Sequence, residues 1–208
     1  MQAKSPLTKP PSARDRLIGA AIRLVREQGY AATSIDDLCR AAGVSKGGFF
    51  HHFVSKDALG IATAAAWEAH AASLFDTADY RTDPDPVARV LGYIRHRAAL
   101  IEGSMAEFSC VAGTMVQEVH QTNPPLRAAC GAAIFGHADS LADDFDAALA
   151  ARGVTATTGL SLARHVQAVL QGGFIMAKAS GDAAAAHDAI SHLETYVRLL
   201  LGRGAAND

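Results

Sequence analysis

Residues 33–59 read TSIDDLCRAAGVSKGGFFHHFVSKDAL, and this stretch decides the fold. Gly43 interrupts a pattern that is helical on both sides, because glycine readily adopts the left-handed conformation that ends a helix. Thr33 can cap the first of the two helices, with Asp36 reaching back from three positions later in a capping box. Ser45 can cap the second. Two short helices joined by a tight turn form a helix-turn-helix.

The second of these helices has two chemically different faces. Phe49 and Phe53 are four residues apart, so they share one face and are expected to pack inward beside Val44. The other face is expected to carry Lys46, Gly47, Phe50 and His51. A helix-turn-helix lays its second helix in the major groove of DNA. There a lysine neutralises a phosphate and glycine lets the backbone come close, so the pattern predicts double-stranded DNA as a partner.

Capped helices are expected on both sides of this motif. The helix before it is expected over residues 13–28, with Gly29 as its stop, because four apolar residues recur along one stripe. These are Leu17, Ala21, Leu24 and Val25. The helix after it begins at the Ser55 cap and runs toward Asp76. Its first amides, together with Lys56, are suited to holding a second phosphate.

The remainder of the chain also has a helical pattern. Asp85-Pro86 and Asn123-Pro124 are typical helix starts, since the missing N–H of proline is not needed in the first turn. No stretch alternates as a strand would, so the sequence predicts an all-α fold of about nine helices. The helices of this region are expected near residues 86–102, 105–120, 124–151, 157–180 and 183–201.

Charge is distributed unevenly along the chain and supports a division into parts. Residues 1–60 carry nine Lys and Arg against five Asp and Glu, whereas the remainder carries ten against sixteen. A basic segment joined to an acidic body indicates that one end meets a polyanion. The proline-rich start has no periodicity and is interpreted as a flexible arm. The expected divisions are the arm at 1–12, a helix-turn-helix DNA-binding domain at 13–56 and a larger helical domain at 57–208.

Several other classes of protein are disfavoured. No apolar run approaches the ~20 residues of a membrane span, and prolines replace the apolar stretch of a secretion signal, so a cytoplasmic protein without membrane contact is expected. Three cysteines without a C-x-x-C pair, and nine scattered histidines, predict neither a disulfide framework nor a metal site. No nucleotide-binding loop or nucleophile elbow is present, so neither an enzyme nor a cofactor is expected.

The run from Thr33 to Leu59 closely resembles the DNA-binding segment of TetR-family (TetR/AcrR-type) regulators, and the likeness extends back to Arg16. In order and without a gap it contains a capped helix, Ala-Gly-Val-Ser-Lys-Gly, an aromatic–histidine run and Ser-Lys-Asp-Ala-Leu. Phe50 stands where the family usually carries tyrosine, which removes a hydroxyl able to bond a phosphate. The resemblance implies DNA contacts by Thr33, Ser34, Ser45, Lys46, Gly48, Phe50, His51, His52 and Lys56.

The same resemblance implies that the larger domain binds a small-molecule effector and forms a homodimer through a four-helix interface. Apolar stripes in the last two expected helices independently fit such an interface. The expected interface residues are Val166, Leu170, Gly173, Ala177, Leu193, Val197 and Leu200. Aromatic, sulfur-containing and a few polar side chains are candidates for the effector pocket. They are Trp67, Phe108, Cys110, Met115, Glu118, Phe135, His165 and Phe174.

The expected function is sequence-specific transcriptional regulation. The simplest form is repression that ends when a small hydrophobic effector releases the protein from a palindromic operator; activation is the other possible sign. One alternative on the same fold is a thiol-based sensor in which Cys110 reacts with an electrophile or oxidant. Another is a DNA-binding protein without a sensor, which the large acidic domain argues against.

Overall fold

All the regular secondary structure in the part of the chain that the structure describes is helical. The computed structural model describes residues 10–202, which contain eleven α-helices, one short 3₁₀ turn and no strand, so the all-α prediction is confirmed. Most of the expected arm at 1–12 lies outside the described residues, as do residues 203–208. The elements are α1 Ala13–Gln28, α2 Ile35–Ala42, α3 Lys46–His52, α4 Lys56–Asp76, η1 Asp79–Thr82, α5 Pro86–Ala99, α6 Met105–Phe108, α7 Val111–Val119, α8 Pro124–Asp139, α9 Ala142–Ala151, α10 Gly159–Ser180 and α11 Ala184–Gly202.

The structure has two more helices than the nine expected, because two of the expected helices are each divided. The helix expected at 105–120 is interrupted where Ser109 and Cys110 take extended backbone angles, with ψ values of 156° and 120°. These angles allow Cys110 to act as the N-cap of α7. The helix expected at 124–151 is interrupted at Ser140, where α8 ends and a short turn leads into α9.

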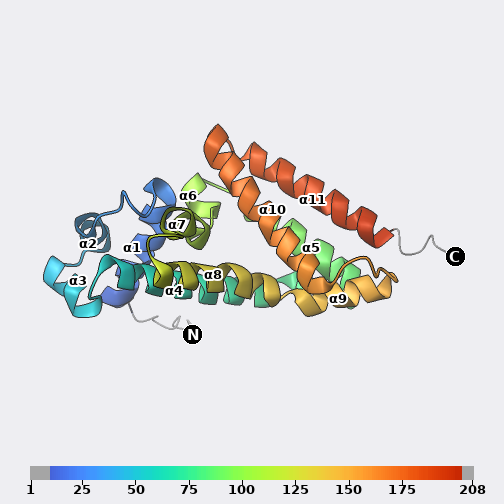
Figure 1. Cartoon of the computed structure of the whole chain (residues 1–208), viewed down its shortest axis with the longest axis horizontal. Coiled ribbons are helices and arrows are strands. Elements are labelled where there is room, and N and C mark those ends of the chain that lie inside the picture. The colour runs from blue at the N-terminus through green and yellow to red at the C-terminus, as the bar shows by residue number, and fades with distance from the viewer. Residues whose placement is uncertain (1–9, 203–208) are drawn as a thin grey trace, which may run out of the picture.

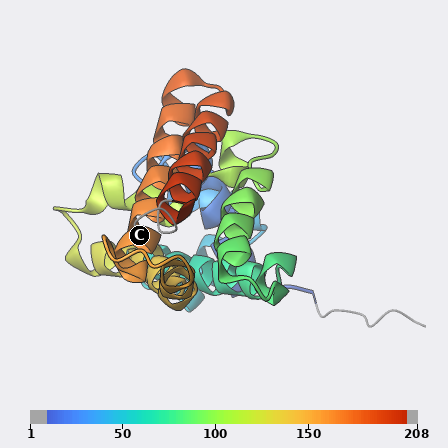
Figure 2. The ribbon, with the colours of Figure 1, turned by 90° about the vertical axis from the view of Figure 1, so that its right-hand side faces the viewer.

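The helices form an elongated arrangement with the helix-turn-helix at one end (Figure 1). Helices α1, α2 and α3 gather at that end, and α4 runs away from it along the length of the molecule beside α8. Helices α10 and α11 pack against each other as an antiparallel pair, which Figure 2 shows standing to one side of α4, α8 and α9. No helix among residues 10–202 is both long enough and apolar enough to cross a membrane.

Two apolar cores correspond to the two ends of this arrangement. The smaller core joins α1, α2, α3 and the start of α4, and the larger core runs through the remaining helices. Ile22 of α1 packs against both. The smaller core includes Leu17, Leu38, Phe49, Phe53 and Leu59. Because α1 and α4 contribute to both cores, they are the physical connection between the helix-turn-helix and the rest of the protein.

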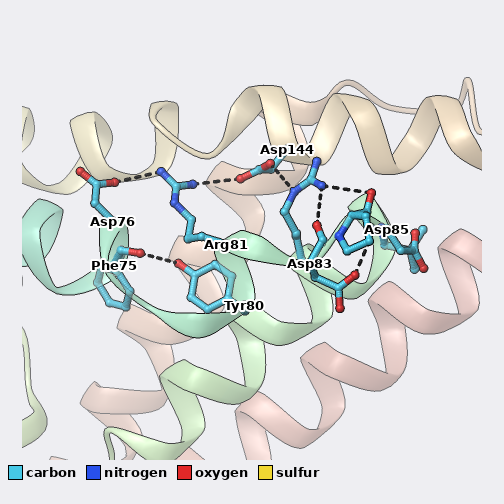
Figure 3. A network of polar contacts seen from close by, with 10 residues as sticks. Phe75, Asp76, Tyr80, Arg81, Asp83, Asp85 and Asp144 are labelled. Carbon is cyan, nitrogen blue, oxygen red and sulfur yellow. Dashed lines mark hydrogen bonds and ion pairs between the residues drawn. The ribbon is translucent and has the colours of Figure 1, made fainter.

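A polar network fixes the end of the molecule that lies opposite the helix-turn-helix (Figure 3). Arg81 of η1 donates to Asp76 at the end of α4 at 2.9 Å and to Asp144 of α9 at 3.0 Å. The Nε of Arg89, on α5, donates to the same Asp144 at 2.9 Å. The Asp144 side chain is only 23% exposed, so solvent and salt screen these contacts less than they screen a surface ion pair. The network therefore fixes α4, α5 and α9 to one another.

The turn between α1 and α2 is held by two opposite charges, an arrangement that we call the turn clasp. The Glu118 carboxylate of α7 accepts hydrogen bonds from the backbone N–H of Tyr30 at 2.8 Å and of Ala31 at 2.7 Å. From the other side the Lys56 ammonium of α4 donates to the carbonyls of Tyr30 and Thr33, at 3.0 and 3.1 Å. The turn clasp therefore anchors main-chain atoms of the helix-turn-helix domain to α4 and α7.

Gly29 is the residue that makes the turn clasp possible. Its φ of +92° lies in the region that favours glycine, and a Cβ there would stand 2.8 Å from Oε1 of Glu118. We expect Gly29→Ala to lower the free energy of unfolding by about 1–3 kcal/mol, because it combines backbone strain with displacement of Glu118. The matched control is Gly19→Ala in α1, where a Cβ meets nothing within 4 Å. That variant should gain about 0.5–1 kcal/mol in urea unfolding, and equal effects of the two substitutions would contradict this account.

Candidate functional site

Helix α3 is positioned by its cap and by two buried aromatic rings. Ser45 Oγ accepts a hydrogen bond from the Gly48 N–H at 3.0 Å, and the preceding Gly43 has a left-handed φ of +61° that ends α2. Phe49 is fully buried and Phe53 is 5% exposed, both inside the smaller core. The inward face predicted from the spacing of these two residues is confirmed. Burying this face leaves the opposite face of α3 toward solvent.

The exposed face of α3 carries the residues suited to meet DNA. Lys46, His51 and His52 are exposed, and Phe50 is 49% exposed, which is unusual for so large an apolar ring. The Lys46 ammonium lies 3.0 Å from Asp36 of α2, and both side chains are more than half exposed. A surface ion pair of this kind is weak, so a DNA phosphate can replace the carboxylate.

The cap of α2 lies one residue later than predicted. Ser34, not Thr33, caps the helix, and its reciprocal partner is Asp37, not Asp36. Thr33 is only 1% exposed, and its hydroxyl donates to the carbonyl of Gly29 at 2.7 Å. Its side chain therefore serves the turn between α1 and α2, whereas Ser34 lies at the exposed N-terminus of α2.

Two other residues expected at the DNA surface have roles inside the fold. Lys56 is half-buried, with its ammonium engaged in the turn clasp and 4.4 Å from the centre of the Tyr30 ring. Gly48 is half-buried, and a Cβ on it would stand 2.9 Å from Cγ1 of Val44. Close packing of α3 on the preceding turn is therefore a sufficient reason for glycine at this position. The exposed set of expected contacts comprises Ser34, Ser45, Lys46, Phe50, His51 and His52.

Because Lys46 is exposed and Lys56 is half-buried, substituting each lysine should have a different effect. We expect Lys56→Met to lower the free energy of unfolding by about 1–3 kcal/mol, because two carbonyls lose a charged donor. Lys46→Ala should change it by no more than about 0.5 kcal/mol, since its ion pair is exposed. On duplex DNA, Lys46→Ala should reduce the slope of log K against log salt by about one. Urea unfolding and a salt titration by fluorescence anisotropy measure both effects. If Lys46→Ala lowered the free energy of unfolding as much as Lys56→Met does, this assignment would be contradicted.

A cavity of about 330 Å³ lies inside the larger core, within reach of α1 and α4. This volume is within the usual range for sites that bind small organic molecules. Its walls come from helices α1, α4, α5, α6, α8 and α10 and from the segments that flank α6. Trp67 and Phe75 of α4 form part of one wall, and Phe174 of α10 forms part of another. A molecule in this cavity would touch both helices that connect to the helix-turn-helix.

Half of the expected pocket residues line this cavity. They are Trp67, Phe108, Cys110 and Phe174. The structure places the other four elsewhere. Met115 is fully buried in the core, and Glu118 belongs to the turn clasp. Phe135 is 54% exposed, with the Arg164 guanidinium 5.4 Å from its ring centre, and exposed His165 packs edge-on against Tyr196. An aromatic or polar side chain at helical spacing does not reveal which side of its helix faces a cavity.

The sequence interpretation missed the polar lining of the cavity. Polar residues that line it and were not predicted include Arg26, His70, Arg97, Glu107, His137, Gln167 and Gln171. One signal was present for Arg26, which follows Ile18 and Ile22 at intervals of four and so continues their inward stripe on α1. Among residues 10–202 no group of three His, Cys, Asp or Glu could hold a metal ion.

His137 is a buried, neutral histidine at the edge of this cavity. Its Nε2 shares a hydrogen bond of 2.9 Å with the Tyr93 hydroxyl, and its ring lies 4.6 Å from that of Phe75. Burial, together with the positive charges of Arg97 and Arg81, lowers the pKa of His137 to about 4. Burial also raises the pKa of Tyr93. Both groups therefore remain uncharged at neutral pH.

The depressed pKa of His137 gives a defined pH dependence of stability. Below the ordinary histidine pKa of 6.5 the unfolded chain takes up a proton that the folded chain takes up only near pH 4. This contribution, at most about 3 kcal/mol, is complete above pH 6.5 and is lost as the pH falls toward 4. We expect His137→Gln to flatten the fall in unfolding free energy across this window, measured by urea unfolding at several pH values. The same slope in the variant and the parent would contradict the assignment.

The residues expected at the dimer interface lie inside the subunit instead. Val166, Leu170, Gly173, Ala177, Leu193 and Val197 are all buried in the single chain, and Leu200 is half-buried. A Cβ on Gly173 would stand 3.3 Å from the Cβ of Ala189, so this glycine allows α10 and α11 to cross closely. The apolar side chains that these two helices expose are on other faces. They are Leu160, Ile175, Met176, Tyr196 and Leu199.

A capped helix-turn-helix with an exposed second helix, joined to a larger helical domain, defines a DNA-binding protein. Comparison with known families shows which class of DNA-binding protein this is. Residues 17–63 match the model for bacterial regulatory proteins of the tetR family, and residues 86–192 match the model for the C-terminal domain of LmrA/YxaF-like transcriptional regulators. The chain belongs to the TetR family of transcriptional regulators, which are DNA-binding proteins and not enzymes.

Individual relatives agree with this assignment. The transcriptional regulator AcuR of Cereibacter sphaeroides is 31% identical over 121 residues, which cover 56% of this chain and 53% of AcuR, so the match spans about half of that relative. A regulatory protein TetR from Rhodobacter sphaeroides has a similar structure, with a TM-score of 0.77, 25% identity and coverage of 88% of this chain and 98% of that one. A TetR-family regulator from Agrobacterium tumefaciens has a TM-score of 0.78, 21% identity and coverage of 90% and 98%.

Proposed function

We propose that this protein is a ligand-responsive repressor that binds a palindromic operator as a homodimer. In this proposal residues 13–56 form the DNA-binding domain and residues 57–208 form the effector-binding and dimerisation domain. The observation that carries the proposal is the position of the cavity, whose walls include Arg26 of α1 and Trp67 of α4. Both helices also contribute to the core of the helix-turn-helix. Repression is the proposed sign because occupying an operator is enough to block polymerase.

DNA contact is assigned to the exposed face of α3 and the N-terminus of α2. Lys46 would pair with a phosphate, while Phe50, His51 and His52 would lie in the major groove. Ser34 and Ser45 would meet the backbone at the starts of their helices. Thr33, Gly48 and Lys56 would act indirectly, by holding α2 and α3 in place.

The homodimer is assigned to the outward faces of α10 and α11. Ile175 and Met176 on α10 are 46% and 61% exposed, and Tyr196 and Leu199 on α11 are 47% and 59% exposed. Large apolar side chains exposed on two packed helices are typical of a subunit interface. Two such pairs would form a four-helix bundle and bring two copies of α3 to one face, as a palindrome requires.

Release of DNA requires that the effector bind one arrangement of the helices more tightly than the other. A molecule that fills the cavity would press on α4 and on α1 and so change the spacing of the two recognition helices. A second candidate trigger is the thiol of Cys110, which lines the cavity and is 9% exposed. An electrophile that entered the cavity would reach this thiol.

We also infer a cytoplasmic location, where operator DNA is accessible.

The experiment that tests this proposal selects DNA from a random duplex library with the purified full chain. We expect enrichment of a palindrome bound with two α3 helices about one helical turn, ~34 Å, apart.

A substitution tests the proposed dimer interface. Ile175→Glu should halve the mass measured by light scattering and weaken palindrome binding at least about tenfold, because a charge is placed in the apolar interface. Ile61→Glu, on the exposed side of α4, is the matched control. Sequence-indifferent binding that raised salt abolishes, or a monomeric parent protein, would contradict the proposal.

A further inference from the structure

The cavity contains a buried guanidinium that has no partner. Arg26 is only 9% exposed although it is an arginine, and it reaches the cavity from α1. Its Nε and Nη2 are both buried and make no hydrogen bond within the described residues. The Trp67 ring packs on it, with its centre 4.9 Å from the guanidinium carbon, and Glu107 is near enough to act on its charge without forming an ion pair. Buried N–H groups of a charged side chain that lack acceptors destabilise a fold, so this arrangement needs another explanation.

The two unpartnered atoms lie on one edge of the guanidinium. Nε–H and the adjacent Nη2–H point the same way and match the two oxygens of a carboxylate. The protein uses this same edge elsewhere. Arg164 donates from Nε and Nη2 to the two oxygens of Asp139, at 2.9 and 3.0 Å. Arg26 has the identical donor pair without a hydrogen-bond partner in the described chain, and its side chain forms part of the cavity lining.

The surroundings of Arg26 add positive charge and further free donors. Arg97 also lines the cavity, its guanidinium carbon is 5.1 Å from the centre of the Phe75 ring, and it forms no ion pair among residues 10–202. The one acidic residue of the lining, Glu107, caps α6 by accepting from the Ser104 N–H at 2.6 Å. The Nε2 of Gln171 is buried without an acceptor. The cavity therefore has a net positive lining.

The rest of the lining defines the size and polarity of the occupant. Trp67, Phe108 and Phe174 supply aromatic surface, and the volume of about 330 Å³ suits a compact organic molecule. Burial lowers the pKa of Arg26, which reflects the unfavourable environment that a bound anion would relieve. An occupant that fits has one anionic group at the Arg26 guanidinium and an apolar body against the rings.

We propose that the effector of this regulator is a small organic carboxylate with an aromatic or alicyclic body, bound by the guanidinium of Arg26. The proposal rests on the cavity being the effector site. The carboxylate accepts hydrogen bonds from Arg26, and Gln171 belongs to the same lining. The class is a carboxylate and not a phosphate monoester, because Arg26 and Arg97 against Glu107 leave the lining one net positive charge, which a carboxylate neutralises and a phosphate monoester would exceed.

The same residue gives the ligand a direct connection to the DNA-binding domain. Arg26 lies on the last turn of α1, immediately before the turn clasp at Gly29 to Thr33. Ile18 and Ile22 on the same face of α1 pack into the core that holds α2 and α3. An anion that binds Arg26 therefore acts on α1 itself, in addition to any displacement of α4.

The test measures binding of acids and their neutral isosteres to the full chain in the absence of DNA. Trp67 is the only tryptophan in the sequence and lines the cavity, so its fluorescence reports occupancy directly. The probes are phenylacetate and cyclohexanecarboxylate, each with its carboxamide, and phenyl phosphate. We expect each acid to bind at least about tenfold more tightly than its amide, because only the acid pairs with the guanidinium. This comparison uses the unmodified protein and does not depend on a variant.

Two variants on α1 locate the anion. Arg26→Met should weaken acid binding at least about tenfold and raise the melting temperature of the ligand-free protein by about 2–4 °C, since it removes a buried guanidinium whose N–H groups lack acceptors. Arg23→Met is the matched control, because Arg23 is 52% exposed and pairs with Glu27 on the surface of the same helix. It should leave acid binding unchanged.

The outcomes are decisive in both directions. Equal binding of acids and amides, no response to any probe at millimolar concentration, or acid binding retained in Arg26→Met would overturn the proposal. Tighter binding of phenyl phosphate than of either acid would overturn the carboxylate class. Because DNA is absent, failure of the operator selection with acid binding intact would refute the regulatory function and leave this binding site standing.

Discussion

The arrangement of the molecule depends on how the turn between α1 and α2 is held. Glu118 and Lys56 carry opposite charges and come from different helices, yet both bind backbone atoms of the same turn. Charged partners make stronger hydrogen bonds than neutral ones, and two of them fix the turn from both sides. The turn that leads into α2 is therefore fixed to α4 and α7, which belong mainly to the larger domain.

This construction explains why the cavity and the helix-turn-helix are not independent. Helix α4 starts at the turn clasp and carries Trp67 into the cavity wall, while α1 carries Arg26 into the same cavity and ends at the same turn. At the opposite end, the ion pairs of Arg81 and Asp144 fix α4 against α5 and α9 (Figure 3). A displacement of α4 at Trp67 would therefore be transmitted to its N-terminal end, where Lys56 holds the turn clasp.

Features that depend on local sequence were predictable, whereas those that depend on neighbouring helices were not. The inward face of α3 follows from the spacing of Phe49 and Phe53, and Ser45 has no competing cap nearby. The cap of α2 was placed one residue early, because Thr33-Ser34 and Asp36-Asp37 are adjacent pairs of equivalent residues. The stripe around Val166 was correctly apolar but was assigned to the wrong partner, because α10 has apolar residues on its inward and outward faces. Arg26 was missed because a charged residue normally indicates solvent.

The turn clasp has a consequence for how such proteins are diversified. Glu118 and Lys56 recognise main-chain N–H and carbonyl groups, which every sequence possesses, and require only that Gly29 keep its left-handed φ. The side chains that would read bases lie on α3, outside this attachment. Recognition helices can therefore be exchanged between relatives without changing the turn clasp, so chimaeras that pair a new operator preference with this larger helical domain are structurally feasible.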